Sequence, residues 1–167
     1  MGDDVRYDGR NKLSAAVMAL SPYVEWISVC PEVEVGMGVP REPIQLNARS
    51  DGVLSAEERV RVAGVQSGED WTERMEQWTS QRVAELASLG ISGFVLKARS
   101  PSCGPANVAV HHREREPTPT GRGLFAEALT RTIPDLPMED EEALENPRVR
   151  ELFLERIREY ARRHASR

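Results

Sequence analysis

The side chains in this sequence that are best suited to chemistry surround two cysteines. Cys30 comes directly before Pro31-Glu32, and Cys103 ends the run Ser100-Pro101-Ser102-Cys103. A thiolate is a soft metal ligand, a neighbouring carboxylate can transfer protons, and a serine can hold a polar ring by hydrogen bonds. Their wide separation suits neither a disulfide-dense secreted scaffold nor a closed zinc ribbon. A metal site and two small buried cysteines in turns both remain open.

Both cysteines are predicted to follow strands. Residues 24–29, directly before Cys30, are rich in β-branched and aromatic side chains, and residues 93–97 have the composition of a buried strand that leads into the Cys103 loop. In open parallel sheets, ligands bind outside the carboxyl ends of the strands. We therefore expect both cysteines at one edge of a sheet, with Arg41 and Lys97 in nearby loops able to orient a polar ring.

The remaining elements follow from apolar periodicity and from turn residues. We expect helices over 9–20, 70–88 and 124–130, short strands at 44–46 and 108–110, and loops at 34–41 and 114–120. Asn146-Pro147 starts an amphipathic helix that continues to Tyr160. The alternation predicts an α/β fold with a mostly parallel, Rossmann-like central sheet flanked by helices, and with this C-terminal amphipathic helix.

Length and charge limit the classes of function. The 167 residues suffice for one compact domain plus a terminal helix. A net charge of −5 argues against a nucleic-acid backbone as partner, because phosphate binding needs clustered positive charge. The apolar runs are too short to span a bilayer, and the acidic start has no secretory pattern, so we expect a cytoplasmic, bacterial protein without a membrane partner.

Three stretches resemble the thiouracil desulfurase family in order and approximate spacing. They are Gly2-x-x-Val5-Arg6-Tyr7-Asp8-Gly9, then Cys30-Pro31-Glu32 with Gly36-Met37-x-x-Pro40-Arg41, then Lys97-x-x-Ser100-Pro101-Ser102-Cys103-Gly104. Weaker matches are Gly68-x-Asp70-x-Thr72 and Gly121-x-Gly123-Leu124-Phe125-Ala126. The resemblance implies a desulfurase-like domain over 1–138 and a C-terminal helical extension over 139–167.

The resemblance also implies a cofactor and roles for individual residues. The family holds a 4Fe-4S cluster by three cysteines, and the fourth iron takes the sulfur of a thiolated base. Cys30 and Cys103 match two of these ligands. Glu32 matches an acidic residue that protonates the ring or activates water, and either Ser100 or Ser102 is its hydrogen-bonding partner.

Further residues of the matching stretches are candidate substrate contacts. These are Arg6, Tyr7, Asp8, Arg41 and Lys97. A structural turn closed by Asp8-Gly9 explains the first three about as well as a contact to substrate.

The sequence departs from the family at its start. Relatives have a short apolar strand and a cysteine just before the first matching stretch, whereas Met1 takes that place here, so the third cluster ligand is missing from this chain. The first hypothesis is an enzyme that removes sulfur from 2-thiouracil or a related thiolated pyrimidine base or nucleoside. The alternative is a catalytically silent small-molecule-binding domain without a competent cluster. A third interpretation, a thiol redox protein, requires the two sulfurs to lie within bonding distance.

Overall fold

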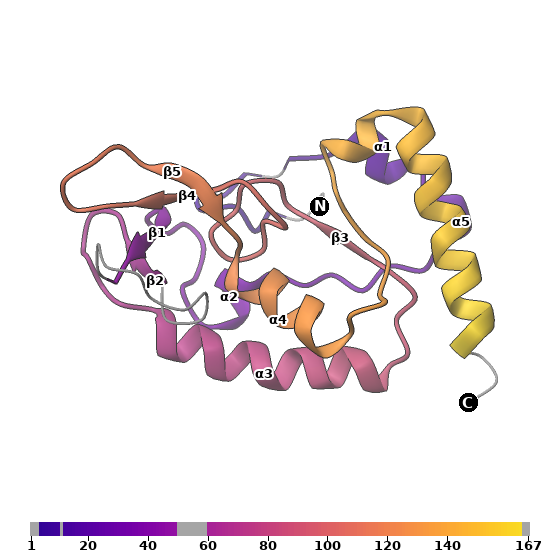
Figure 1. The fold of residues 1–167 in the computed structure, drawn as a ribbon, viewed down its shortest axis with the longest axis horizontal. Coiled ribbons are helices and arrows are strands. Elements are labelled where there is room, and N and C mark those ends of the chain that lie inside the picture. The colour runs from indigo at the N-terminus through magenta and orange to yellow at the C-terminus, as the bar shows by residue number, and fades with distance from the viewer. Residues whose placement is uncertain (1–3, 11, 50–59, 165–167) are drawn as a thin grey trace.

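The computed structural model describes residues 4–10, 12–49 and 60–164, which form an α/β fold (Figure 1). The helices are α1 (Ala15–Met18), α2 (Pro31–Glu34), α3 (Thr72–Ser88), α4 (Leu124–Thr132) and α5 (Pro147–His164), with 3-10 helices η1 (Ser21–Tyr23) and η3 (Ala143–Glu145). The strands are β1 (Ile44–Ala48), β2 (Val60–Gly64), β3 (Phe94–Leu96), β4 (Val108–His111), β5 (Thr118–Gly121) and β6 (Met138–Asp140).

The strands form mixed sheets. One sheet has the order β2-β1-β4-β5, in which β1 pairs with β2 antiparallel, β1 with β4 parallel, and β4 with β5 antiparallel. A second sheet pairs β3 with β6 in parallel. The predicted α/β class is confirmed, whereas the sheet is mixed and not mostly parallel and Rossmann-like as predicted. β5 also occupies part of the predicted 114–120 loop, and because it returns directly from β4 without a crossover helix, the two strands run antiparallel.

One local prediction near the N-terminus is wrong, and a second holds only in part. Residues 24–29 form no strand in the described structure. The apolar residues of this segment serve packing, since Val24 and Val29 lie against different core clusters. The helix predicted over 9–20 is limited to Ala15–Met18, where the Ser14 hydroxyl accepts a hydrogen bond from the Val17 N–H.

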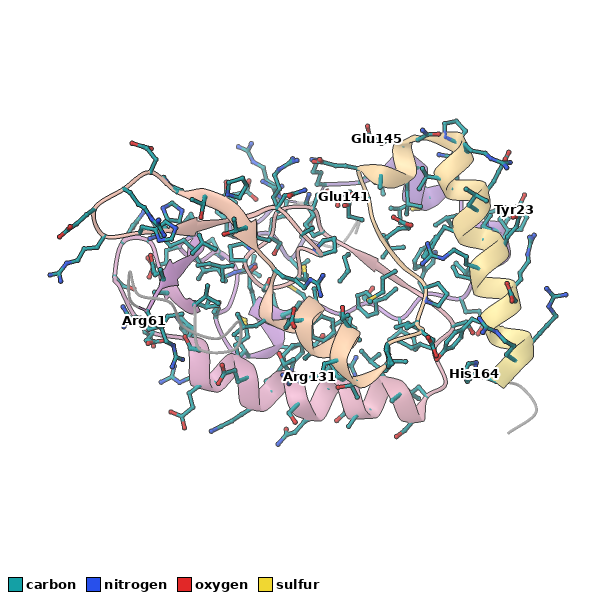
Figure 2. All side chains as sticks on the ribbon, in the orientation of Figure 1. Tyr23, Arg61, Arg131, Glu141, Glu145 and His164 are labelled. Atoms are coloured by element: carbon teal, nitrogen blue, oxygen red, sulfur yellow. The ribbon has the colours of Figure 1, made fainter. Side chains whose placement is uncertain are left out.

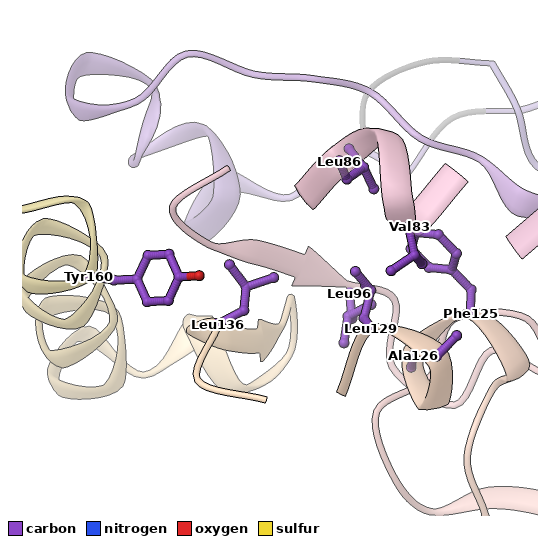
Figure 3. Close-up of a cluster of buried hydrophobic side chains, with 9 residues drawn as sticks. Val83, Leu86, Leu96, Phe125, Ala126, Leu129, Leu136 and Tyr160 are labelled. Atoms are coloured by element: carbon purple, nitrogen blue, oxygen red, sulfur yellow. The ribbon is translucent and has the colours of Figure 1, made fainter. Parts of the chain in front are cut away.

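The predicted long helix, α3, is confirmed and carries the central core. Its buried face packs on α4, where the rings of Trp78 and Phe125 lie 5.5 Å apart. Figure 3 shows Val83 of α3 and Leu96 of β3 in the same cluster as Phe125. This core fixes the end of β3 and the start of α4, which together hold the Cys103 loop.

The predicted C-terminal amphipathic helix is confirmed as α5. Phe153 packs with Leu20 and Leu144, and Tyr160 reaches the cluster of Figure 3. In Figure 1 the helix runs along one end of the molecule, beside α1. Among the described residues, no helix is both long and apolar enough to cross a membrane.

Candidate functional site

The Cys103 loop is a tight turn directly after β3, as the sequence predicted. The Gly104 N–H donates to the Ser100 carbonyl at 2.7 Å, and the Cys103 N–H donates to Ser100 Oγ at 3.3 Å. Arg99 enters the turn with a φ of 57°, in the left-handed region that non-glycine residues rarely adopt. The turn therefore has a defined shape, which presents Ser102 and Cys103 from one short loop.

The start of α4 supports this loop from behind. The Phe125 N–H donates to the Ser102 carbonyl at 2.9 Å, and the Gly123 N–H donates to the Gly104 carbonyl at 2.9 Å. A Cβ at Gly123 would lie 2.5 Å from both the Cys103 nitrogen and the Ser102 carbonyl carbon. Glycine is required there because two backbones meet without space for a side chain. The Gly121-x-Gly123 match was the only sequence signal for this support.

Two ion pairs hold the other side of the same loop. Lys97 pairs with the buried Glu141, whose second oxygen accepts from the Ala98 N–H at 2.7 Å. Arg99 pairs with Glu142 through Nη1 at 2.6 Å, and this contact lowers the pKa of Glu142. Glu141 is labelled in Figure 2. Sequence reasoning missed both carboxylates, because they lie in the segment assigned to the helical extension.

Cys30 begins α2 rather than ending a strand. It is the N-cap residue, Pro31 occupies the first turn, and the Cys30 N–H donates to Glu34 Oε1 at 3.1 Å. Its sulfur lies 3.9 Å from the Val5 carbonyl oxygen. The N-terminal matching stretch therefore passes directly beside this thiol.

Glu32 stands between the two cysteine loops. Its Oε1 accepts a 2.8 Å hydrogen bond from the Ser102 hydroxyl, and its Oε2 accepts from Arg41 Nε at 2.9 Å and Nη2 at 2.6 Å. The Glu32 side chain is 15% exposed, and the Arg41 side chain is 6% exposed. The carboxylate is thus fixed through both oxygens in a largely buried position.

These contacts extend into a continuous chain of polar groups. Arg41 Nη2 also donates to the Val5 carbonyl at 2.9 Å, which is the oxygen beside Cys30. Ser102 Oγ lies 3.0 Å from Ser100 Oγ, which in turn accepts from the Cys103 N–H. Both serines belong to this series of hydrogen-bonded groups, and Ser102 is the serine that contacts the Glu32 carboxylate.

Burial raises the pKa of both thiols. For Cys30 the main cause is desolvation, and the negative charge of Glu32 acts in the same direction. For Cys103 desolvation again dominates, while hydrogen bonds from Ser100 and the Lys97 backbone oppose it. A metal that binds these sulfurs must displace their protons.

The other predicted substrate contacts are placed differently. Arg6 and Asp8 pair with each other at 3.1 Å on the surface, and the partly exposed Tyr7 lies beside Arg6. The backbone of this stretch reaches the site, since the Arg41 N–H donates to the Tyr7 carbonyl at 2.9 Å. Lys97 holds Glu141. Gly2 and Met1 lie outside the described residues.

The two cysteine loops supply fewer donors than a three-cysteine cluster needs. The sequence holds two cysteines, both present as free thiols. Over 4–10, 12–49 and 60–164, no three His, Cys, Asp or Glu side chains gather in a way that could hold a metal ion. Iron-sulfur clusters usually take more than two thiolates. The residues present are therefore one ligand short of that site.

A surface cavity of about 530 Å³ borders the site at Arg41. Met37, Ile44 and Trp71 supply apolar lining, and the remaining lining residues are Glu42, Gln66, Ser67 and Glu69. Its volume is in the range of small-molecule sites. The cavity shares Arg41 with the site, whereas Glu32, the two serines and the two cysteines are not among its lining residues.

Comparison with known proteins identifies the family of the chain. The sequence profile described as 2-thiouracil desulfurase matches residues 1–141. The chain belongs to the 2-thiouracil desulfurase family. The chain is also similar to the uncharacterized protein YbbK of Bacillus subtilis (strain 168). The two sequences are 31% identical over 104 aligned residues, and this aligned region covers 62% of this chain and 67% of YbbK.

A solved structure is also similar. It is the [4Fe-4S]-dependent thiouracil desulfidase TudS, with a TM-score of 0.63 and 26% identity over 89% of this chain and 88% of that chain. The resemblance inferred from the three stretches is confirmed. A thiouracil desulfidase-like function is indicated for the chain, and a cluster is supported for its family.

Proposed function

We propose that the chain is a hydrolytic desulfurase that acts on 2-thiouracil or a related thiolated pyrimidine, as free base or nucleoside. The observation that carries this proposal is the hydrogen bond from Ser102 to Glu32, which joins the two cysteine loops at a largely buried carboxylate. TudS, the similar solved protein, is described as a thiouracil desulfidase. The same substrate class is proposed here.

The proposed reaction replaces sulfur by oxygen at one ring carbon without oxidation or reduction. A water oxygen forms a bond to the carbon that carries sulfur, the carbon–sulfur bond breaks, and sulfur leaves as hydrogen sulfide. Glu32 accepts one proton from the attacking water and passes it to the leaving sulfur, directly or through the ring nitrogen, and the second proton passes from the new hydroxyl to the leaving sulfide as the ring carbonyl forms, so that both water protons end on hydrogen sulfide. The Ser102 hydroxyl holds Oε1 in place, and Ser100 holds Ser102.

The cofactor enters this proposal only through its ligands. Cys30 and Cys103 are the proposed thiolate ligands of a 4Fe-4S cluster, and a complete site needs a donor beyond these two. Because the described residues fall short, the proton transfers above are assigned to Glu32 alone, and Ser102 holds its carboxylate in place. Arg6, Tyr7, Asp8 and Lys97 remain proposed substrate contacts, and a small thiolated base or nucleoside is the proposed partner.

The missing ligand favours a second candidate function. With two cysteines the chain can retain a pocket for a pyrimidine ring and lack turnover, as a silent binding domain. The two candidates bind the same small molecule, but only the first converts it. Binding and turnover must therefore be measured separately.

The experiment uses the chain reconstituted anaerobically with iron and sulfide in the presence of an added thiol. We expect 2-thiouracil absorbance to fall and sulfide to appear, and Glu32→Gln to slow this roughly 100- to 10,000-fold while substrate affinity is kept. Glu25→Gln, an exposed carboxylate before the site, is the matched control and should have wild-type turnover. Binding without turnover would support the silent domain, and absence of both would refute both candidates.

A further inference from the structure

We infer that Arg41 is a positioning residue for Glu32 and not a substrate contact, given the proton-transfer role proposed for Glu32. The sequence placed Arg41 among residues that could orient a polar ring. In the structure its guanidinium is directed toward the protein. The side chain is 6% exposed and forms an ion pair with Glu32.

The hydrogen-bond donors of Arg41 are almost fully used within the chain. A guanidinium has five N–H groups in a fixed plane. Nε and one Nη2 hydrogen serve Glu32 Oε2, the other Nη2 hydrogen serves the Val5 carbonyl, and Nη1 donates to the Gly38 carbonyl at 2.9 Å. A residue that binds substrate must keep donors for it, and within the part of the chain that the structure describes, one N–H of Arg41 has no acceptor.

The two carboxylate oxygens of Glu32 have different hydrogen-bond partners. Both donors from Arg41 meet Oε2, whereas Oε1 receives, among the described residues, only the Ser102 hydroxyl. Oε2 is therefore the anchored atom. The direction of Oε1 is set by this anchor on the opposite side of the carboxylate.

Arg41 also fixes where α2 lies. It connects Glu32 on this helix to Val5, whose carbonyl is beside Cys30, and to Gly38 in the loop after the helix. A lysine has one point of charge and cannot reach these three partners in the plane of a guanidinium. Arg41→Lys should keep the charge and lose the geometry.

The test compares Arg41→Gln and Arg41→Lys with wild type in the full chain. Calorimetry gives the 2-thiouracil dissociation constant, a crystal structure gives the Glu32 position, and the reconstituted protein gives kcat and KM. We expect Glu32 Oε1 to move away from Ser102, kcat to fall on the order of 100-fold, and affinity to change less than about threefold. Arg74→Gln, in an exposed ion pair on α3, is the control and should change none of these.

Two outcomes would overturn the inference. One is a tenfold or larger loss of affinity with Glu32 unmoved, which is what a substrate contact predicts; the other is no change in either. If both the affinity and the Glu32 position change, the effect of Arg41→Gln is measured again in a Glu32→Gln background. A loss of affinity that persists in this background overturns the positioning role, because no Glu32 carboxylate is left to position. A loss of affinity that disappears in this background supports the positioning role. Failure of wild type to bind thiouracil would defeat the proposed function, while the Glu32 position still tests the role of Arg41.

Discussion

The Ser102 hydroxyl donates a 2.8 Å hydrogen bond to Glu32 Oε1 across 70 positions of sequence. Ser102 is 1% exposed, and Glu32 is held from its other oxygen by Arg41. Because each partner belongs to a different cysteine loop, this contact fixes the distance between the loops. Loss of the contact should therefore affect stability as well as any chemistry at the carboxylate.

We predict that Glu32 and Ser102 are energetically coupled. In a double-mutant cycle of Glu32→Ala and Ser102→Ala, the coupling energy should be about 1 to 2 kcal/mol, because the hydrogen bond is charge-assisted and largely removed from water. Urea unfolding of the four proteins measures it. The unpaired Arg41 left by Glu32→Ala is present in both arms and cancels.

A second cycle provides the control. Ser88 donates to the Ala84 carbonyl on the exposed face of α3, so Ser88→Ala and Glu32→Ala should be additive. A coupling energy for Glu32 and Ser102 no larger than for this control pair would show that their hydrogen bond contributes nothing to stability.

Iron retention should depend on both cysteines and on an added thiol. After anaerobic reconstitution, we expect the wild-type chain to keep iron while 2-mercaptoethanol is present and to lose it on desalting, because an external thiolate can complete a site that is one ligand short. Cys30→Ser and Cys103→Ser should each hold less iron than wild type with 2-mercaptoethanol present. Iron and protein assays measure this, and circular dichroism checks the fold. A serine variant with the full wild-type iron content would exclude that cysteine as a ligand.

Local periodicity predicted the elements that pack through one face. Met75, Val83 and Leu86 recur on one side of α3, and this pattern is sufficient to identify the helix because the buried face decides its packing. The segment before Cys30 shows the limit of this reasoning. Its β-branched residues favour an extended chain, but strand pairing depends on a neighbour that local sequence does not encode.

Residue-level roles depended on contacts that are distant in sequence. The resemblance brought Cys30, Glu32 and Ser102 to attention, but left the choice of serine open. The pairing of Arg41 with Glu32 and of Lys97 with Glu141 followed only from the fold. A charged residue in a matching loop is equally compatible with substrate or with a buried carboxylate until its partner is known.

Gly123→Ala should destabilise the Cys103 loop. The new Cβ would lie 2.5 Å from backbone atoms of Ser102 and Cys103, which cannot rotate away, so α4 or the loop must shift. We expect a loss of about 1 to 3 kcal/mol in the free energy of unfolding and a change in the Cys103 amide NMR signal. The φ of Gly123 is −66°, so alanine meets no backbone strain there.

Gly36→Ala separates strain from crowding. Gly36 has a φ of 97°, and apart from its two chain neighbours no described residue has an atom within 4 Å of the point that its Cβ would occupy. Its substitution should therefore cost only the backbone strain of roughly 1 to 2 kcal/mol and leave the Cys103 signal unchanged. Gly123→Ala with wild-type stability and an unshifted Cys103 amide would refute the close approach of the two backbones.

The last prediction concerns acid and the ion pair that holds the Cys103 loop. Hydrogen bonds from Arg99 hold the pKa of Glu142 below its usual range. A carboxyl whose pKa is lower in the folded state stabilises the fold fully above its unfolded pKa of about 4.3, and this contribution is lost as pH falls through the folded value. Between neutral pH and about pH 3, the free energy of unfolding should therefore fall more steeply in wild type than in Glu142→Gln.

Hydrogen exchange shows whether this loss is local. In wild type, the protection of the amides of residues 97–104, relative to an unfolded chain at the same pH, should fall as Glu142 is protonated, because Arg99 then loses its partner. In Glu142→Gln this protection should already be low at neutral pH. Glu155→Gln, an exposed carboxylate on α5, is the control and should follow the wild-type curve. Equal acid slopes for wild type and Glu142→Gln, with unchanged exchange in the loop, would mean that the pair does not hold it, and that the buried contact of Glu141 with Lys97 and Ala98 is sufficient.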